Sequence, residues 1–192
     1  MTQSKCDQEQ NKPIRILVVG DSLSTEHGLA PGTGWVERLK LALDRDLPTA
    51  VVKNASIAGN TTSHGVSRLQ SLLLQETPTH VIIELGGFDA SRGLPLDLIE
   101  KNLTEMIAMV QSTQAEVVLI GMQTPSNHDP SYSEQFKNIF SEIATSTHSA
   151  LVTFEGFTEQ RQYFQADGVH PNETAQPEIL KNIRQALDRL LP

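Results

Sequence analysis

A serine that directly follows a strand-like segment is the first residue of chemical interest in this chain. Ser22 lies in the run GDSLS at 20–24, just after the apolar segment 14–19. A serine in a tight turn after a strand can present its hydroxyl at the edge of a sheet and its backbone N–H at the start of a helix. Alternatively, Asp21 or Ser22 simply caps that helix. The segment alone leaves both interpretations open.

A carboxylate and a histidine with suitable spacing lie near the other end of the chain, in the run DGVHP at 167–171. A nucleophilic serine needs a base within hydrogen-bonding reach and a group that holds this base in the correct tautomer. Asp167 can turn back to Nδ1 of His170 and leave Nε2 facing Ser22. The alternative is a helix-entry loop with a capping aspartate and a surface histidine. Together with the serine run, the pair favours nucleophilic catalysis.

Five short runs rich in apolar and β-branched residues predict the strands that position these residues. The runs occupy 14–19, 50–54, 80–85, 116–120 and 150–154. Their near-continuous apolar character indicates a parallel sheet that is buried on both faces. The segments between and after them carry apolar stripes at helical spacing: Trp35, Leu39, Ala42 and Leu43; Val66, Leu69 and Leu73; Ile99, Leu103, Met106, Ile107 and Val110; Phe136, Ile139, Phe140 and Ile143; Ile179, Ile183, Leu187 and Leu190.

This alternation predicts a three-layer α/β/α sandwich with a five-stranded parallel sheet in the flavodoxin-like order 2-1-3-4-5. The segments 20–33, 86–95 and 121–131 lack a clear period and directly follow strands. Because open α/β sheets bind ligands at the carboxyl ends of their strands, these loops are expected to form the site.

Composition limits the remaining possibilities. We expect a flexible polar segment at 1–13 and a single domain over 14–192. A formal charge of −8 disfavours nucleic acid as a partner, and no apolar run is long enough for stable membrane insertion. Cys6 lies in a polar opening segment that lacks the apolar stretch of a signal peptide, so a cytoplasmic location is expected. A periplasmic or secreted location is the alternative if an export signal has been removed.

The sequence resembles the GDSL/SGNH serine hydrolase family from about residue 14 to 190. The resemblance rests on ILVVGDSLS, NASIAGNTT, ELGG followed by Arg92 and Gly93, and DGVHPNETAQP. These runs are most similar to the bacterial multifunctional thioesterase/arylesterase/lysophospholipase subgroup. The resemblance implies hydrolysis of short to medium acyl esters, thioesters, aryl esters or lysophospholipids, with Ser22 as nucleophile, His170 as base and Asp167 as its orienting acid.

The resemblance also implies an oxyanion hole, and here the chain departs from the family pattern. The backbone N–H groups of Ser22 and Gly59 would be two donors, although Gly59 can equally be a turn glycine. The third donor of the family is an asparagine side chain, but this chain has Phe88 at that position. Loss of one such donor typically lowers the rate about 10²-fold to 10³-fold. We therefore expect a weakened or engineered enzyme. A site with another donor, such as Asn60, and a catalytically silent module that binds a small anion or a carbohydrate are the alternatives.

Further expectations concern what the site binds. Phe88 can stack on aryl esters or narrow the acyl slot, or it can be a core residue. The loop 124–133, with Pro125, Asn127, Pro130 and Tyr132, is expected by position and resemblance to line an acyl or leaving-group pocket. No metal-ligand spacing occurs, so neither a metal nor a cofactor is expected, and the enzyme is expected to be a monomer or weak dimer. The residues expected to contact a small acyl ester or thioester are Asp21, Leu23, Asn60, Gly87, Phe88 and Pro125.

Overall fold

The computed structural model describes residues 13–124, 129–154 and 160–191. Its centre is a parallel sheet in the spatial order β2-β1-β3-β4-β5, so the predicted strand order is confirmed. Val18 of β1 is paired with Asn54 of β2 on one side and with Ile82 of β3 on the other. The strands are β1 (Arg15–Gly20), β2 (Val51–Asn54), β3 (His80–Glu84), β4 (Glu116–Ile120) and β5 (Ala150–Val152).

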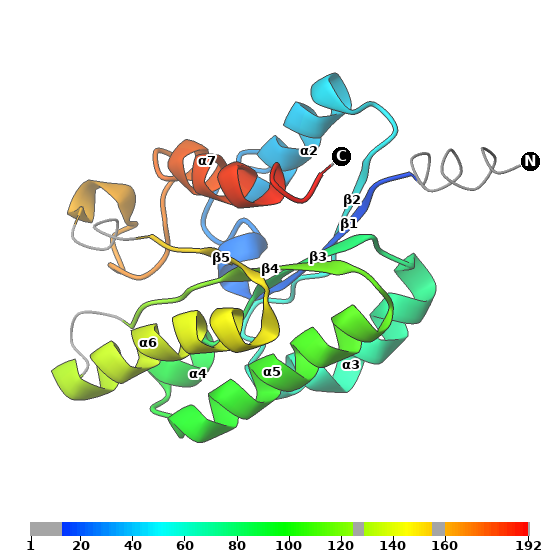
Figure 1. Ribbon diagram of the computed structural model, residues 1–192. Coiled ribbons are helices and arrows are strands. Elements are labelled where there is room, and N and C mark those ends of the chain that lie inside the picture. Colours follow the sequence, from blue (N-terminus) through cyan, green and yellow to red (C-terminus); the bar gives the residue numbers. More distant parts are fainter. Residues whose placement is uncertain (1–12, 125–128, 155–159, 192) are drawn as a thin grey trace, which may run out of the picture.

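Helices cover both faces of this sheet, which confirms the three-layer sandwich (Figure 1). α2 (Trp35–Asp46) and α7 (Gln176–Leu187) pack together on one face. The other face is covered by α3 (Thr62–Glu76), α5 (Leu96–Ser112) and α6 (Pro130–Thr147), which contact one another in that order. Among the described helices, none is long and apolar enough to cross a lipid bilayer.

Three short elements complete the described chain and flank the carboxyl edge of the sheet. They are the 3-10 helices η1 (Ser22–Ser24) and η2 (Arg161–Tyr163) and the short helix α4 (Gly87–Ser91). The sequence pattern gave no helix within 86–95, because a helix this short contains too few residues to display an apolar period.

The edge strand β2 differs from the expectation that the strands are buried on both faces. Its residues alternate between exposed and half-buried, and the side chain of Val51 is 57% exposed. Within the described chain β2 pairs only with β1, so solvent reaches it from its open side. The inner strands β1, β3 and β4 follow the prediction and are almost wholly buried.

Gly20, the last residue of β1, leaves room for the buried carboxyl group of Glu84 next to the turn that carries Ser22. A Cβ atom on Gly20 would lie 2.5 Å from Oε2 of Glu84, a distance that real Cβ atoms do not show. This oxygen accepts hydrogen bonds from the hydroxyl of Ser24 (2.7 Å) and from the backbone N–H of Asp21 (3.1 Å). Glu84 thus ties Asp21 and Ser24, one residue before and two residues after Ser22, to the end of β3.

Burial makes this carboxyl group favour its neutral form. Glu84 is 2% exposed, and burial together with the nearby Asp21 carboxylate raises the pKa of Glu84 well above its ordinary value. Burial also raises the pKa of Asp21, which is 3% exposed. A neutral Glu84 avoids placing two negative charges beneath the turn that carries Ser22.

The variant Glu84→Gln tests this protonation state because it keeps a neutral group of the same shape. At a pH above 4.5, the ordinary pKa of a glutamate, the unfolded chain releases the Glu84 proton while the native state retains it. The free energy of unfolding of the parent therefore falls as the pH rises. The difference between the free energies of unfolding of the variant and the parent should therefore increase in favour of the variant, by up to about 1.4 kcal/mol per pH unit.

Urea unfolding from about pH 5 to about pH 8 measures this difference. The matched control is Glu105→Gln, which makes the same substitution on the exposed face of α5. A difference between Glu84→Gln and the parent that is independent of pH would mean that Glu84 is ionised in the native state.

Candidate active site

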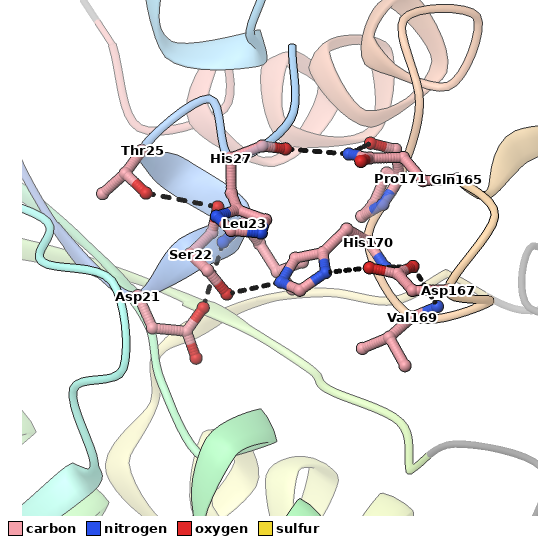
Figure 2. A network of polar contacts seen from close by, with 10 residues as sticks. All are labelled: Asp21, Ser22, Leu23, Thr25, His27, Gln165, Asp167, Val169, His170 and Pro171. Atoms are coloured by element: carbon pink, nitrogen blue, oxygen red, sulfur yellow. Dashed lines mark hydrogen bonds and ion pairs between the residues drawn. The ribbon is translucent and has the colours of Figure 1, made fainter.

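Ser22 lies where β1 ends and η1 begins, as the sequence pattern predicted. Asp21 is the N-cap of η1, and its side chain accepts a hydrogen bond from the backbone N–H of Leu23 (3.1 Å). The capping interpretation is therefore correct for Asp21, and it leaves the side chain of Ser22 available for another contact. Figure 2 shows that the Ser22 hydroxyl points toward His170.

His170 and Asp167 lie on the loop between η2 and α7 and contact each other as the spacing suggested. Nδ1 of His170 lies 2.6 Å from Oδ2 of Asp167, and Nε2 lies 3.0 Å from Oγ of Ser22 (Figure 2). A carboxylate partner requires the proton of a neutral imidazole to be on Nδ1, which leaves Nε2 as an acceptor for the serine hydroxyl.

The Asp167 carboxylate is held by its own loop. Its Oδ1 accepts hydrogen bonds from the backbone N–H groups of Val169 (2.9 Å) and His170 (3.0 Å). Partial burial opposes ionisation, but these bonds and the one from the His170 ring lower the pKa of Asp167 to about 2. Asp167 is therefore a carboxylate at neutral pH and can stabilise a positive charge on His170.

Gly59 lies on the loop between β2 and α3 and lines the same cavity as Ser22 and His170. Its φ of +77° is in the left-handed region that favours glycine, so its role in the turn is evident. The chain beyond it is anchored by Asp89 of α4, which is fully buried. The Asp89 carboxylate accepts bonds from the backbone N–H (2.9 Å) and the hydroxyl (2.6 Å) of Thr62, and Asn102 donates to that hydroxyl (2.9 Å).

Phe88 faces the cavity rather than the core. Its side chain is 38% exposed and lines the cavity, and the Arg92 guanidinium lies 5.7 Å from the centre of its ring. Asn60 is not among the lining residues, and its Oδ1 is buried without a hydrogen-bond partner among the described residues. The geometry thus gives Asn60 no evident place as a substitute for the missing amide.

The cavity has a volume of about 750 Å³ and opens beside Ser22. Ser22, Asp167 and His170 all line it, and most of its lining surface is apolar. Among the substrate-contact predictions, Asp21, Leu23, Gly87 and Phe88 line it. The apolar lining includes Trp35, Ile120, Met122, Phe154, Phe164 and Ile179.

The loop predicted to line this cavity contributes little of it within the described residues. Thr124 lines the cavity, but Pro130 and Tyr132 belong to the first turn of α6 and do not. The hydroxyl of Tyr132 donates to the backbone carbonyl of Leu94 (2.9 Å). Pro125 and Asn127 lie outside the described residues.

Several residues near the site had no signal in the sequence. Asp89 and Glu84 are buried and hold neighbouring segments of the site by hydrogen bonds. In the sequence, Asp89 is an ordinary residue of a glycine-rich loop and Glu84 an ordinary residue of a strand. His27 belongs to no motif in the sequence, yet its ring centre lies 4.3 Å from that of His170. These contacts join segments that are far apart in the sequence, so the local spacing of residues cannot predict them.

Comparisons with known proteins identify the family of this chain. Residues 18–176 match the model of the GDSL-like Lipase/Acylhydrolase family. The chain is 40% identical over 178 residues to Esterase TesA of Pseudomonas aeruginosa, covering 92% of this chain and 89% of that protein. It is 34% identical to Thioesterase 1/protease 1/lysophospholipase L1 of Escherichia coli K12, covering 92% and 84%.

Solved structures give the same result. A crystal structure of TesA superposes with a TM-score of 0.88 at 40% identity, over 92% of this chain and 99% of that one. The psychrotrophic esterase EstA from Pseudoalteromonas sp., in a structure inhibited by monoethylphosphonate, gives 0.84 at 36% identity, over 92% and 98%. Sequence, fold and site geometry together establish that this chain belongs to the GDSL-like lipase/acylhydrolase family of hydrolases.

Proposed function

We propose that this chain hydrolyses carboxylic esters and thioesters through an acyl-enzyme formed on Ser22. The observation that carries the proposal is the line of contacts from Ser22 Oγ to His170 Nε2 (3.0 Å) and from His170 Nδ1 to Asp167 (2.6 Å). This is the arrangement of nucleophile, base and orienting acid that acyl transfer requires.

The reaction proceeds in two steps. His170 takes the proton of Ser22 as the serine oxygen attacks the acyl carbon, and the resulting imidazolium is stabilised by Asp167. The same histidine then donates this proton to the departing alcohol or thiol. In the second step water attacks the acyl-enzyme with His170 again as base, and the carboxylic acid is released as His170 passes the proton to the departing Ser22 oxygen. The protein groups suffice for both steps without a cofactor.

The oxyanion that forms in each step is stabilised by the backbone N–H groups of Ser22 and Gly59. Phe88 stands where the family has an asparagine, so this hole has two donors and the enzyme is weakened. The largely apolar lining of the cavity suits an acyl chain or an aryl leaving group. The relatives named esterase and thioesterase/lysophospholipase support ester and thioester substrates for this chain.

Ser22→Ala removes the proposed nucleophile. We expect kcat for a p-nitrophenyl ester of a short acid to fall about 10⁴-fold or more, because the attack on the acyl carbon is lost. The matched control is Ser141→Ala on α6, an exposed serine whose hydroxyl donates only to the carbonyl of Asn138, and it should keep the parent's rate. Equal rates for Ser22→Ala and the parent would reject the acyl-enzyme.

Phe88→Asn restores the side-chain donor of the family. We expect kcat to rise about 10²-fold or more, since an oxyanion donor acts chiefly on the transition state. Steady-state kinetics with the same ester measures the change. Phe88→Leu is the control, because it removes the ring without adding a donor and should show no such rise. An unchanged or lower rate for Phe88→Asn would mean that the loop is built around phenylalanine.

Asn60→Ala tests whether this neighbouring amide replaces the missing donor. Since Asn60 does not line the cavity, we expect kcat to stay within about two-fold of the parent, far less than the loss of an oxyanion donor. The same ester assay measures it. A fall of about 10²-fold or more, with an unchanged melting temperature, would instead identify Asn60 as the third donor.

A further inference from the structure

His27 packs its ring against the ring of His170. The two ring centres lie 4.3 Å apart with their planes inclined by 40°, and Figure 2 shows His27 beside His170. His27 is exposed and lines the cavity, on the segment that follows η1. Its ring nitrogens form no hydrogen bond with the described residues, so ring packing is the contact through which it acts on His170.

The hydrogen bonds of His170 leave one motion of its ring weakly restrained. Both nitrogens lie on the edge of the ring, so the two hydrogen bonds together set the line that runs from Asp167 through the ring to Ser22. Rotation of His170 about its side-chain bonds, which moves the ring out of its present plane, would carry Nε2 away from Ser22 Oγ. The side chains of His170 and Asp167 are 20% and 43% exposed, so the core does not enclose this pair on every side. The ring of His27, packed against that of His170, opposes such a rotation.

The backbone of His27 is fastened to the loop that carries His170 by Gln165. The side-chain amide of Gln165 donates to the carbonyl of His27 (2.8 Å) and to the carbonyl of Pro171 (3.1 Å). The backbone N–H of Gln165 donates to the carbonyl of His170 (2.8 Å). These three bonds are here called the Gln165 bridge. They connect the segment of His27 to the loop of His170 and so keep the two histidine rings in contact (Figure 2).

The contact also suits the charge that His170 acquires. In the proposed reaction His170 becomes an imidazolium, and the face of an aromatic ring within about 6 Å attracts a cation through its π electrons. An aromatic ring at position 27 therefore suits this step better than an aliphatic side chain would.

We propose that His27 is a positioning residue, which holds the ring of His170 toward Ser22 and is itself held by the Gln165 bridge. This proposal rests on the acyl-enzyme function proposed above. It assigns His27 no proton transfer, and it predicts that an aromatic ring at position 27 is the property that matters. An aromatic substitution should therefore preserve the role, whereas truncation should remove it.

The test compares His27→Ala and His27→Phe in the full chain, with p-nitrophenyl butyrate as substrate. His27→Ala should lower kcat about 10-fold or more and change KM less than about two-fold, because it misplaces the base without removing substrate contacts of comparable strength. His27→Phe should return kcat to within about three-fold of the parent, since the ring contact is kept. Thermal unfolding of each variant separates these effects from a loss of folded protein.

A second pair of variants tests the bridge. Gln165→Ala should lower kcat in the same direction as His27→Ala, and combining the two should add little, because both act on one contact. Gln162→Ala is the matched control, an exposed glutamine of η2 whose side chain bonds only to Gln160 in the described chain, and it should leave kcat unchanged.

Two results would overturn the positioning role: a parent-like kcat for His27→Ala, or an equal loss of kcat in His27→Phe and His27→Ala. Ser22→Ala is assayed alongside to separate this failure from a failure of the proposed function. If Ser22→Ala is inactive, either of those results rejects the role of His27 alone. If Ser22→Ala is fully active, the acyl-enzyme and the positioning role that rests on it are both rejected.

Discussion

The contact between the Ser22 hydroxyl and Nε2 of His170 is the interaction on which the rest of the site depends. It spans 3.0 Å and joins residues 148 positions apart in the sequence. The sheet order makes it possible, because β1 lies inside the sheet and delivers Ser22 to the carboxyl edge. The loop before α7 reaches the same edge from the other side and brings His170 with it. A displacement of about 1 Å on either side would weaken proton transfer severely.

The two sides of this contact are supported in different ways. The serine side is fixed from within, by the buried carboxyl group of Glu84, which binds Asp21 and Ser24. The histidine side lies on an exposed loop and is fixed by polar contacts at the surface, through Asp167 and the Gln165 bridge. Because the nucleophile is fixed by the core whereas the base lies on an exposed loop, an additional contact from the ring of His27 can help to position the base.

Much of the architecture could be predicted because it follows from local pattern. Buried parallel strands demand apolar runs, and the spacing of Asp167 and His170 lets a carboxylate turn back to an imidazole. The remaining features depend on which distant segments meet. Whether Phe88 faces the cavity or the core is set by a helix too short to have a period, and the meeting of His27 with His170 is set by two loops. Glu84 ends an apolar strand, and only the approach of Gly20 shows what its carboxyl group binds.

The most direct test of the account is covalent labelling with a p-nitrophenyl alkylphosphonate, followed by mass spectrometry of the intact chain and its peptides. The serine oxygen forms a bond to phosphorus as p-nitrophenolate leaves, so the adduct stays on the nucleophile. The account predicts a single adduct per chain, on the peptide that contains Ser22, formed far more slowly when His170 is replaced by alanine. Ester turnover that persists while Ser22 stays unlabelled, or an adduct on another residue that abolishes turnover, would contradict it.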